Sequence, residues 1–306
     1  MNFTNKSYLR YMFVFLLILS SIVFTSCSLL SYEDETPITL VEIKPGRSLG
    51  IDSVLNLRDM GGFKTTSGAT VASGLVYRSN ELYNISASDM LLLTQLNLKT
   101  VFDFRTEAER AARPDELADG VNYVSLDVQA DDPSAGIGDL SVLLADAQKA
   151  NDTLGGGKIE EKFKEAYRQS VTLPSAKIAY RKLFLALADE KQLPAIFHCA
   201  SGKDRTGWAA AALLSILGVA EEAIVENYLL SNEYVLGQYD EVIKKFLEDG
   251  GHPSIPTATL GVKEEYLAAA FDEMYMQYGS IENYFSEGLG IDTDQQTALR
   301  NIYLNR

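Results

Sequence analysis

Apolar residues along the chain fall into short runs rich in β-branched and aromatic side chains, and most of these runs are followed by segments with helical spacing. The six runs are Val41–Lys44, Val54–Leu57, Leu75–Arg78, Thr100–Phe104, Val121–Val128 and Ala195–Cys199. Short apolar runs bounded by turn residues are typical of buried strands. Their alternation with helical segments predicts an α/β fold with a central sheet.

Helical patterns dominate the second half of the chain. An earlier helix is expected after Ser86, because apolar residues recur at helical spacing up to Leu98 and Ser86 or Ser88 can cap it. Further helices are predicted at Ile159–Val171, Ser175–Asp189, Lys203–Leu217, Glu221–Leu247, Lys263–Tyr278 and Asp292–Leu304. The sequence shows no internal repeat, so residues 39–306 are expected to form one domain.

A polar, glycine-containing stretch runs from Gln129 to Lys158 around a short apolar helix candidate, Leu140–Ala147. An insertion of this length after a strand is usually either a lid or a disordered loop. The composition of the stretch fits both interpretations, and both stay open on the sequence alone.

The first residues carry a targeting pattern. A basic head with Lys6 and Arg10 precedes the apolar run Met12–Phe24, which is shorter than the roughly 20 residues that a membrane span needs. Residues 1–26 are therefore expected to be a signal peptide. The segment up to Cys27 resembles a bacterial lipoprotein signal, in which the cysteine after the cleavage site carries diacylglycerol.

This resemblance implies that Cys27 is lipidated, that residues 27–38 form a lipidated tether, and that the protein is anchored in the bacterial cell envelope. Phe24 and Ser26 stand where the usual signal has Leu and Gly or Ala, so a plain secretory signal or an uncleaved anchor is the alternative. Ser28 after the cysteine, in place of Asp, resembles the sorting signal for the outer membrane.

Charge and cysteine content restrict the possible functions. The chain has 27 Lys and Arg against 42 Asp and Glu, a formal net charge of −15. A broad positive surface for nucleic acid is therefore excluded, and any anionic ligand must be held by local positive charge. The two cysteines, Cys27 and Cys199, are too few for a disulfide framework or a cysteine-rich metal site.

One segment concentrates the chemistry. The apolar strand Ala195–Phe197 runs directly into His-Cys-Ala-Ser-Gly-Lys-Asp-Arg-Thr-Gly, residues 198–207, before an apolar helix begins. Successive backbone N–H groups around a helix N-terminus form an anion-binding nest. These groups, the helix dipole and Arg205 favour the thiolate of Cys199, which makes it a nucleophile. The phosphate-binding part of the loop is expected at Ala200, Ser201, Gly202 and Lys203.

The loop matches the Cys-x5-Arg motif of cysteine-based phosphatases, and five further segments extend the likeness: Asn56–Gly62, Tyr77–Ser79, Val101–Arg105, Tyr228–Asn232 and Tyr278–Glu282. From about residue 43 to the C-terminus the chain resembles the bacterial tyrosine and lipid phosphatases of the protein-tyrosine phosphatase superfamily. The resemblance implies a phosphatase domain over residues 39–306, with a mostly parallel central sheet flanked by helices and a helical C-terminal half. It implies neither a metal nor another cofactor.

Roles for the loop residues follow from this chemistry and from the resemblance. Cys199 is expected to attack phosphorus and form a phosphocysteine, which water then hydrolyses. Arg205 is expected to chelate two phosphoryl oxygens with its planar fork. His198 is expected to position the loop without acting as the acid, and Thr206 to donate its hydroxyl to the sulfur.

The general acid is expected to be Asp204, which lies inside the loop. Asp103 is the second choice, although an ion pair with a nearby arginine is the favoured interpretation of that residue. A third group of candidates lies on the polar stretch: Asp127, Asp131 and Asp132.

The predicted activity is that of a protein-tyrosine phosphatase or dual-specificity phosphatase acting on phosphorylated proteins or small phosphomonoesters. The alternatives are a phosphoinositide or inositol-phosphate phosphatase and, in a different class, a phospho-ligand binding module with weak catalysis. Lys203 either supplies a second cation for ligands with several phosphates or pairs with a carboxylate at the rim. The substrate itself cannot be derived from the sequence.

Overall fold

The computed structural model describes residues 45–132 and 144–304. All described residues belong to one compact unit, Glu42–Arg306. The expected signal peptide, the tether with Cys27, the strand at Val41–Lys44 and residues 140–143 of the helix candidate Leu140–Ala147 lie outside the described residues. Within them, no helix is long and apolar enough to span a membrane.

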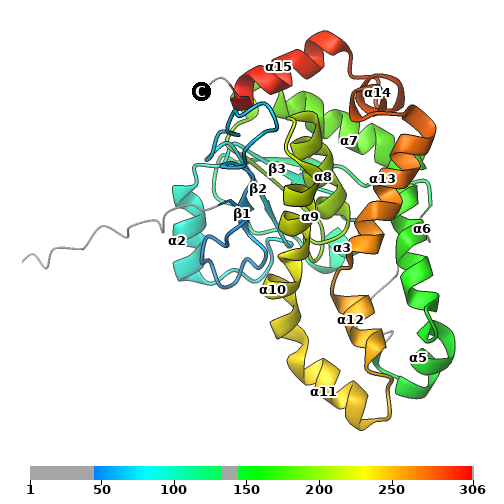
Figure 1. Ribbon diagram of the computed structural model, residues 1–306. Coiled ribbons are helices and arrows are strands. Elements are labelled where there is room, and N and C mark those ends of the chain that lie inside the picture. Colours follow the sequence, from blue (N-terminus) through cyan, green and yellow to red (C-terminus); the bar gives the residue numbers. More distant parts are fainter. Residues whose placement is uncertain (1–44, 133–143, 305–306) are drawn as a thin grey trace, which may run out of the picture. The chain divides into compact units, whose positions relative to one another are not determined.

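The core of the fold is a five-stranded sheet with the order β1-β2-β5-β3-β4 (Figure 1). The strands are β1 (Arg58–Asp59), β2 (Val76–Ser79), β3 (Thr100–Asp103), β4 (Asn122–Ser125) and β5 (Ala195–His198). β2, β5, β3 and β4 pair in parallel, and only β1 is antiparallel to its neighbour. The predicted α/β fold with a mostly parallel sheet is confirmed.

The two faces of the sheet bury different sets of side chains. Val76, Phe102 and Phe197 point into the larger core, whereas their chain neighbours Tyr77, Val101 and Ile196 point into a smaller core on the other face. Because both faces are covered, these strands are apolar without alternation. The helix α2 (Ala87–Gln95) covers the smaller core through Leu93, and Ser86 caps it as predicted.

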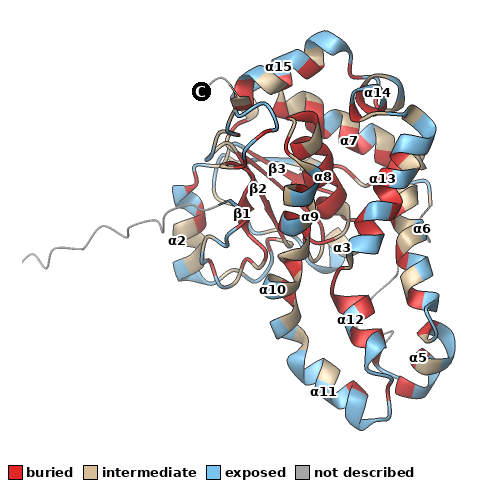
Figure 2. Ribbon diagram, viewed as in Figure 1, coloured by how far each residue is buried: buried red, intermediate tan, exposed pale blue. Residues whose placement is uncertain are grey.

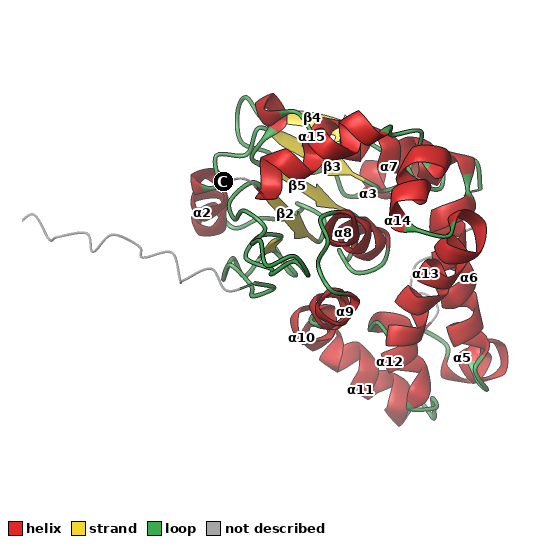
Figure 3. Ribbon diagram, turned by 45° about the horizontal axis from the view of Figure 1, so that its top comes forward, coloured by secondary structure: helices red, strands yellow, loops and turns green. Residues whose placement is uncertain are grey.

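The other helices cover the larger core or extend from it (Figure 3). They are α3 (Glu107–Ala112), α5 (Ala147–Leu154), α6 (Lys158–Thr172), α7 (Pro174–Leu187), α8 (Arg205–Ile216), α9 (Glu221–Leu229), α10 (Ser231–Val235), α11 (Asp240–Glu248), α12 (Ser254–Leu260), α13 (Glu264–Tyr278), α14 (Ile281–Asn283) and α15 (Thr293–Leu304). Single turns lie at η1 (Glu190–Gln192), η2 (Leu236–Tyr239) and η3 (Tyr284–Gly288).

α8 is the helix that follows the central strand, and it is buried almost throughout (Figure 2). Its small residues Ala209–Ala212 allow close packing against the sheet, while Trp208 packs edge-on against Phe271 and Tyr284. This agrees with the apolar pattern of the sequence. The burial of α8 fixes its N-terminus, and with it the position of the preceding loop.

Two sequence predictions were wrong in detail. Val54–Leu57 forms no strand, because Asn56 has a left-handed backbone (φ 57°) and turns the chain before β1. The single helix expected at Glu221–Leu247 is divided into α9, α10, η2 and α11. Ser231 and Asn232 bond outside the helix at the first break, and Gly237 lies at the second.

Part of the polar stretch Gln129–Lys158 is helical. α5 occupies Ala147–Leu154, is capped by Asp146 and buries Ala150 and Leu154. The described end of the stretch is therefore ordered structure that packs on the core, rather than a disordered loop.

Candidate active site

The segment between β5 and α8 lies at the carboxyl edge of the sheet. β5 is parallel to both of its neighbours, β2 and β3, so its carboxyl end emerges between theirs. The amide of Phe104, just after β3, donates to the carbonyl of His198 at 2.9 Å, and the amide of Glu81 donates to the carbonyl of Ala200 at 3.0 Å. The start of the loop is thus held from both sides.

Cys199 opens this loop as a free thiol whose exposed fraction is only 1%. The loop then closes on Asp204, the N-cap residue of α8, and Arg205 is the first residue of the helix. The N-terminal N–H groups of α8 are the positive end of the helix dipole. The buried thiol therefore lies where the helix dipole contributes a positive potential.

Gly202 is the loop residue that lies directly against the end of β2. It has a left-handed backbone (φ 66°), and a Cβ at this position would lie 2.2 Å from the carbonyl oxygen of Ser79. Its own carbonyl oxygen accepts from Asn56 Nδ2 at 2.8 Å and from Arg78 Nη2 at 2.6 Å. Only glycine therefore fits here, and the middle of the loop is clamped to the sheet.

Arg205 is paired with Glu109 of α3. Its Nη1 and Nη2 atoms each donate to one carboxylate oxygen at 2.7 Å, a bidentate arrangement. Burial is the largest single influence and raises the pKa of Glu109, but the hydrogen bonds and charge of Arg205 together with the bonds from Thr106 outweigh it and lower this pKa to about 2. Because a guanidinium has five N–H groups, the edge formed by Nε and Nη2 can still chelate two phosphoryl oxygens.

Glu109 is itself fixed by the start of its helix. Its carboxylate accepts from the backbone amide of Thr106 at 2.8 Å, and the Thr106 hydroxyl accepts from the amide of Glu109, which together form a capping box. Sequence reasoning missed Glu109. The Thr-x-x-Glu pattern could have placed it at a helix start, but not opposite Arg205.

Lys203 is buried and turned away from solvent. Its Nζ atom contacts the Asp204 carboxylate at 2.9 and 3.0 Å, donates to the carbonyl of Gly261 at 3.0 Å, and lies 4.7 Å from the ring centroid of Phe163. Of the two expectations for Lys203, the structure shows the carboxylate pair and not a free second cation. Its backbone remains part of the loop.

Asp204 has the more accessible side chain of this pair, with 28% of it exposed. Tyr167 of α6 donates to Asp204 Oδ1 at 3.1 Å, and the hydroxyls of Tyr167 and Tyr228 lie 2.6 Å apart. Both tyrosines are buried, which raises their pKa well above the usual range. They therefore act as neutral donors that hold the Asp204 carboxyl in place, and neither was singled out as a site residue from the sequence.

Asp103 does not meet the requirements of a general acid. It is fully buried, binds Arg105 through Nη2 at 2.7 Å and accepts from Tyr123 at 2.7 Å. Burial is the largest single influence and raises the pKa of Asp103, but Arg105, His198 and Tyr123 together outweigh it and keep the pKa well below its usual range. The structure shows the ion pair with a nearby arginine that the sequence analysis favoured for Asp103.

His198 lies between the loop and this ion pair. Its Nε2 atom is 3.1 Å from Asp115, and its Nδ1 atom is 3.2 Å from the carbonyl oxygen of Cys199. Asp103, Asp115 and His198 converge closely enough to suggest a metal site. However, Arg105 binds both carboxylates at 2.7 Å, so a guanidinium already balances their charge. This favours an ion-pair network that supports His198.

The remaining candidates are placed as follows. Thr206 is buried at the start of α8, and its hydroxyl has no hydrogen-bond partner among residues 45–132 and 144–304. Donation to the sulfur of Cys199 stays a prediction. Asp127 accepts from the amide of Gln129 in a local turn, and Asp131 accepts from the amide of Ser175 near the start of α7.

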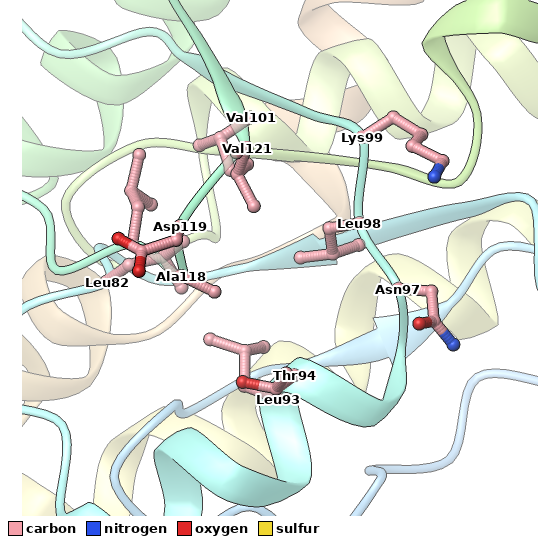
Figure 4. A pocket seen from close by; sticks show the side chains of 12 residues that line it. Leu82, Leu93, Thr94, Asn97, Leu98, Lys99, Val101, Ala118, Asp119 and Val121 are labelled. Carbon is pink, nitrogen blue, oxygen red and sulfur yellow. The ribbon is translucent and has the colours of Figure 1, made fainter.

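A cavity of about 230 Å³ lies away from the loop (Figure 4). Leu93 in α2 and Leu98 just after it line the cavity, together with Val101 in β3 and Val121 just before β4. Lys99, at its edge, precedes β3, so this cavity is at the amino end of a strand whose carboxyl end faces the loop. It is not part of the candidate active site.

A buried thiol at the end of the central strand, an anion-binding loop and an arginine at the start of the next helix define a cysteine-dependent phosphatase. Comparison with known proteins identifies the family. The model of the tyrosine phosphatase family matches residues 49–305. The chain therefore belongs to the tyrosine phosphatase family, and it is an enzyme of the protein-tyrosine phosphatase type.

Three relatives illustrate this membership. A protein of Cupriavidus necator assigned as a tyrosine-protein phosphatase is 31% identical over 84% of this chain and 88% of its own length. The triple specificity protein phosphatase PtpB of Mycobacterium tuberculosis is 29% identical over 81% of this chain and 96% of its own. A tyrosine-protein phosphatase of Nostoc commune is 28% identical over 73% of this chain and 72% of its own length.

Proposed function

We propose that this protein hydrolyses phosphotyrosine in proteins through a phosphocysteine intermediate on Cys199. The observation that carries the proposal is the position of this thiol, which is buried at the N-terminus of α8 next to Arg205. The Sγ atom attacks phosphorus in line, the bond from phosphorus to the tyrosine oxygen breaks, and a water molecule then attacks phosphorus and releases the thiolate.

Arg205 stabilises the phosphoryl oxygens as charge develops on them in the transition state. Glu109 holds the far edge of the guanidinium, so the arginine does not have to find its orientation when the substrate binds. The backbone N–H groups of Ala200–Lys203 complete the phosphate site. Thr206 then donates to the departing sulfur when the intermediate is hydrolysed.

Asp204 protonates the leaving tyrosine oxygen in this proposal. The side chain is partly exposed, and its position is fixed by Tyr167 and Lys203. The proton of the carboxyl group passes to the leaving oxygen.

The proposal is tested with Cys199→Ser and Asp204→Asn on aryl phosphates of graded leaving-group ability. Cys199→Ser should abolish phosphate release. Asp204→Asn should slow turnover by about 100-fold with poor leaving groups and much less with good ones. The matched control is Asp127→Asn, which should retain wild-type rates. Asp204 would not be the general acid if Asp204→Asn had near-wild-type rates, or if Asp127→Asn slowed turnover only with poor leaving groups.

Phosphotyrosine is favoured over inositol phosphates because Lys203 is committed to Asp204 and Gly261 and does not offer a second cation to a ligand. The relative from Mycobacterium tuberculosis is named a triple specificity phosphatase, which supports a wider range that includes phosphoserine and phosphothreonine. A panel of phosphopeptides, phosphoinositides and inositol phosphates separates these cases. Release from inositides without activity on phosphotyrosine would overturn the assignment, and binding without release would favour a binding module.

We also propose that the protein is exported and attached to the bacterial outer membrane through lipid on Cys27. The support is the basic head, the apolar run Met12–Phe24 and the cysteine that follows it. Metabolic labelling with a radioactive fatty acid tests this proposal. Label that disappears in Cys27→Ser, together with recovery of the wild-type protein in the outer-membrane fraction, is expected; an unlabelled protein would contradict it.

A further inference from the structure

Asn232, in the first turn of α10, binds the backbone of Val262, the residue between α12 and α13 that follows Gly261. Its Oδ1 atom accepts from the amide of Val262 at 2.7 Å, and its Nδ2 atom donates to the carbonyl of Val262 at 2.9 Å. Val262 is buried, with an exposed fraction of 3%. Without Asn232, the amide of Val262 would therefore lose its partner where water cannot easily replace it.

The amide of Val262 and the carbonyl of Gly261 belong to the same trans peptide group. The N–H and the C=O of such a group point in opposite directions from one rigid plane. Asn232 binds the N–H end at 2.7 Å, and Lys203 Nζ donates to the C=O end at 3.0 Å. The bond from Asn232 therefore fixes the direction in which this carbonyl meets Lys203, and each of the two bonds polarises the peptide in favour of the other.

Lys203 connects this peptide group to Asp204. Its side chain is fully buried, and its ammonium carries only N–H donors. These donors are shared between the carbonyl of Gly261 and both carboxylate oxygens of Asp204, at 3.0 and 2.9 Å. If the Gly261 carbonyl moved, the ammonium would either lose a buried partner or follow the carbonyl and leave its position beside Asp204.

Gly261 allows Asn232 to come this close. A Cβ at position 261 would lie 2.7 Å from Asn232 Oδ1 and 2.8 Å from the carbonyl oxygen of Thr257. The φ of Gly261 is −92°, which other residues adopt as well. Space rather than backbone conformation therefore requires a glycine at this position.

We propose that Asn232 is a positioning residue for Asp204. By holding the peptide group between Gly261 and Val262, it fixes Lys203 and, through Lys203, the carboxyl group that protonates the leaving oxygen. This inference rests on the proposed function, because it assumes that Asp204 is the general acid. Tyr167 of α6 donates to the same carboxyl group. Asp204 is thus held by contacts that begin on two different helices, α6 and α10.

The test is the rate of phosphate release from aryl phosphates of graded leaving-group ability. Asn232→Ala should lower kcat by about 10-fold with poor leaving groups and by less than about 2-fold with good ones, because only poor leaving groups need a well-placed acid. KM should change little, since Arg205 and the N–H groups of the loop stay in place. If Asn232 only stabilised the fold, its replacement would lower kcat equally for all leaving groups, and this result would overturn the proposal.

Asn151→Ala is the matched control. Asn151 of α5 forms the same pair of bonds with the connection between α11 and α12: it donates to the carbonyl of Gly250 at 3.0 Å and accepts from the amide of His252 at 2.7 Å. Among residues 45–132 and 144–304, neither Gly250 nor His252 bonds to the catalytic loop. Asn151→Ala should therefore keep the wild-type dependence on the leaving group. A selective loss with poor leaving groups in this variant as well would argue against the path through Lys203.

A double substitution tests that path directly. In a Lys203→Met background, adding Asn232→Ala should change the ratio of rates with good and poor leaving groups by less than about 2-fold, because the link to Asp204 is already absent. An effect of Asn232→Ala as large as in the wild-type background would overturn the proposal.

If Asn232→Ala does not fold, Gly261→Ala decides, because it keeps the amide side chain but pushes it away from Val262. This variant should show the same selective loss with poor leaving groups. Wild-type leaving-group dependence in a folded variant at either position would overturn the role of Asn232 and leave the proposed function standing. Wild-type leaving-group dependence in Asp204→Asn would instead overturn the assignment of the acid, and with it the inference that rests on it.

Discussion

Arg205 donates two hydrogen bonds of 2.7 Å to the carboxylate of Glu109. The two residues lie on different helices: Arg205 begins α8, directly after the catalytic loop, and Glu109 is in α3, which follows β3. The pair orients the guanidinium from behind and leaves its other edge for a ligand. Glu109 is itself held in place by the capping box that it forms with Thr106. A helix cap thus takes part in positioning an arginine that is far away in the sequence.

We predict that Glu109→Gln reduces kcat/KM for aryl phosphates by about 10- to 100-fold, mainly through kcat, because Arg205 loses a charged partner that holds its orientation. Steady-state kinetics with wild-type protein and with Glu107→Gln checks this. Glu107 lies in the same first turn of α3 and is exposed, so its replacement should leave the kinetics unchanged. Equal effects of the two substitutions would argue against the orienting role.

The same pair predicts how stability depends on pH. The pKa of Glu109 falls from an ordinary value of 4.5 to about 2 in the folded protein. A lowered pKa contributes stability that is complete above the ordinary value and is lost as the pH falls towards 2. In urea unfolding, the difference in the free energy of unfolding between wild type and Glu109→Gln should therefore be constant above pH 5. This difference should decrease as the pH falls below 5. A difference in the free energy of unfolding that increases on acidification would contradict this prediction.

Gly202→Ala should reduce kcat/KM by more than about 100-fold, because a Cβ would lie 2.2 Å from the Ser79 carbonyl oxygen and push the loop off the sheet. Gly120→Ala is the control: its φ of 83° carries a similar backbone cost of about 1 kcal/mol, but a Cβ there meets no atom within 4 Å. Kinetics and thermal melting of both variants separate the clash from the backbone strain. Comparable activity losses would show that strain alone is responsible.

Asp103→Asn should destabilise the protein by about 3 kcal/mol, since it removes one of the two carboxylates that lie 2.7 Å from the buried Arg105. The dependence of the rate on leaving-group ability should not change, because this carboxylate donates no proton in the reaction. Denaturant unfolding and a leaving-group series on the folded variant are the measurements. A selective loss with poor leaving groups at full stability would return Asp103 to the role of general acid.

The net charge of −15 predicts a salt effect. Repulsion slows the approach of highly phosphorylated ligands, while the short-range contacts of the loop act inside the screening length of about 8 Å at physiological ionic strength. Added salt should therefore raise kcat/KM for such ligands more than for a small aryl phosphate. A flat or falling profile would show that the local positive potential dominates the approach as well.

Several features of this protein were determined by the sequence alone. The strands β2, β3 and β5 are apolar on both faces, and their bounds were predicted within one residue at each end. Strands that are buried on both faces form continuous apolar runs, which stand out in the sequence. The loop from His198 to Gly207 was found because the nucleophile, the arginine and the helix N-terminus are neighbours in the chain.

The tertiary structure decided what lies around that loop. Glu109, Tyr167 and Arg78 reach it from α3, α6 and β2, and the local sequence around each fits an ordinary helix or strand. The charged partners of Lys203 and Asp103, which are Asp204 and Arg105, are near in the sequence. The burial of both side chains and their additional bonds to Gly261 and Tyr123 come from the fold. Chain neighbours fix the chemistry of a loop, but the charge balance of a buried site depends on residues that only folding brings together.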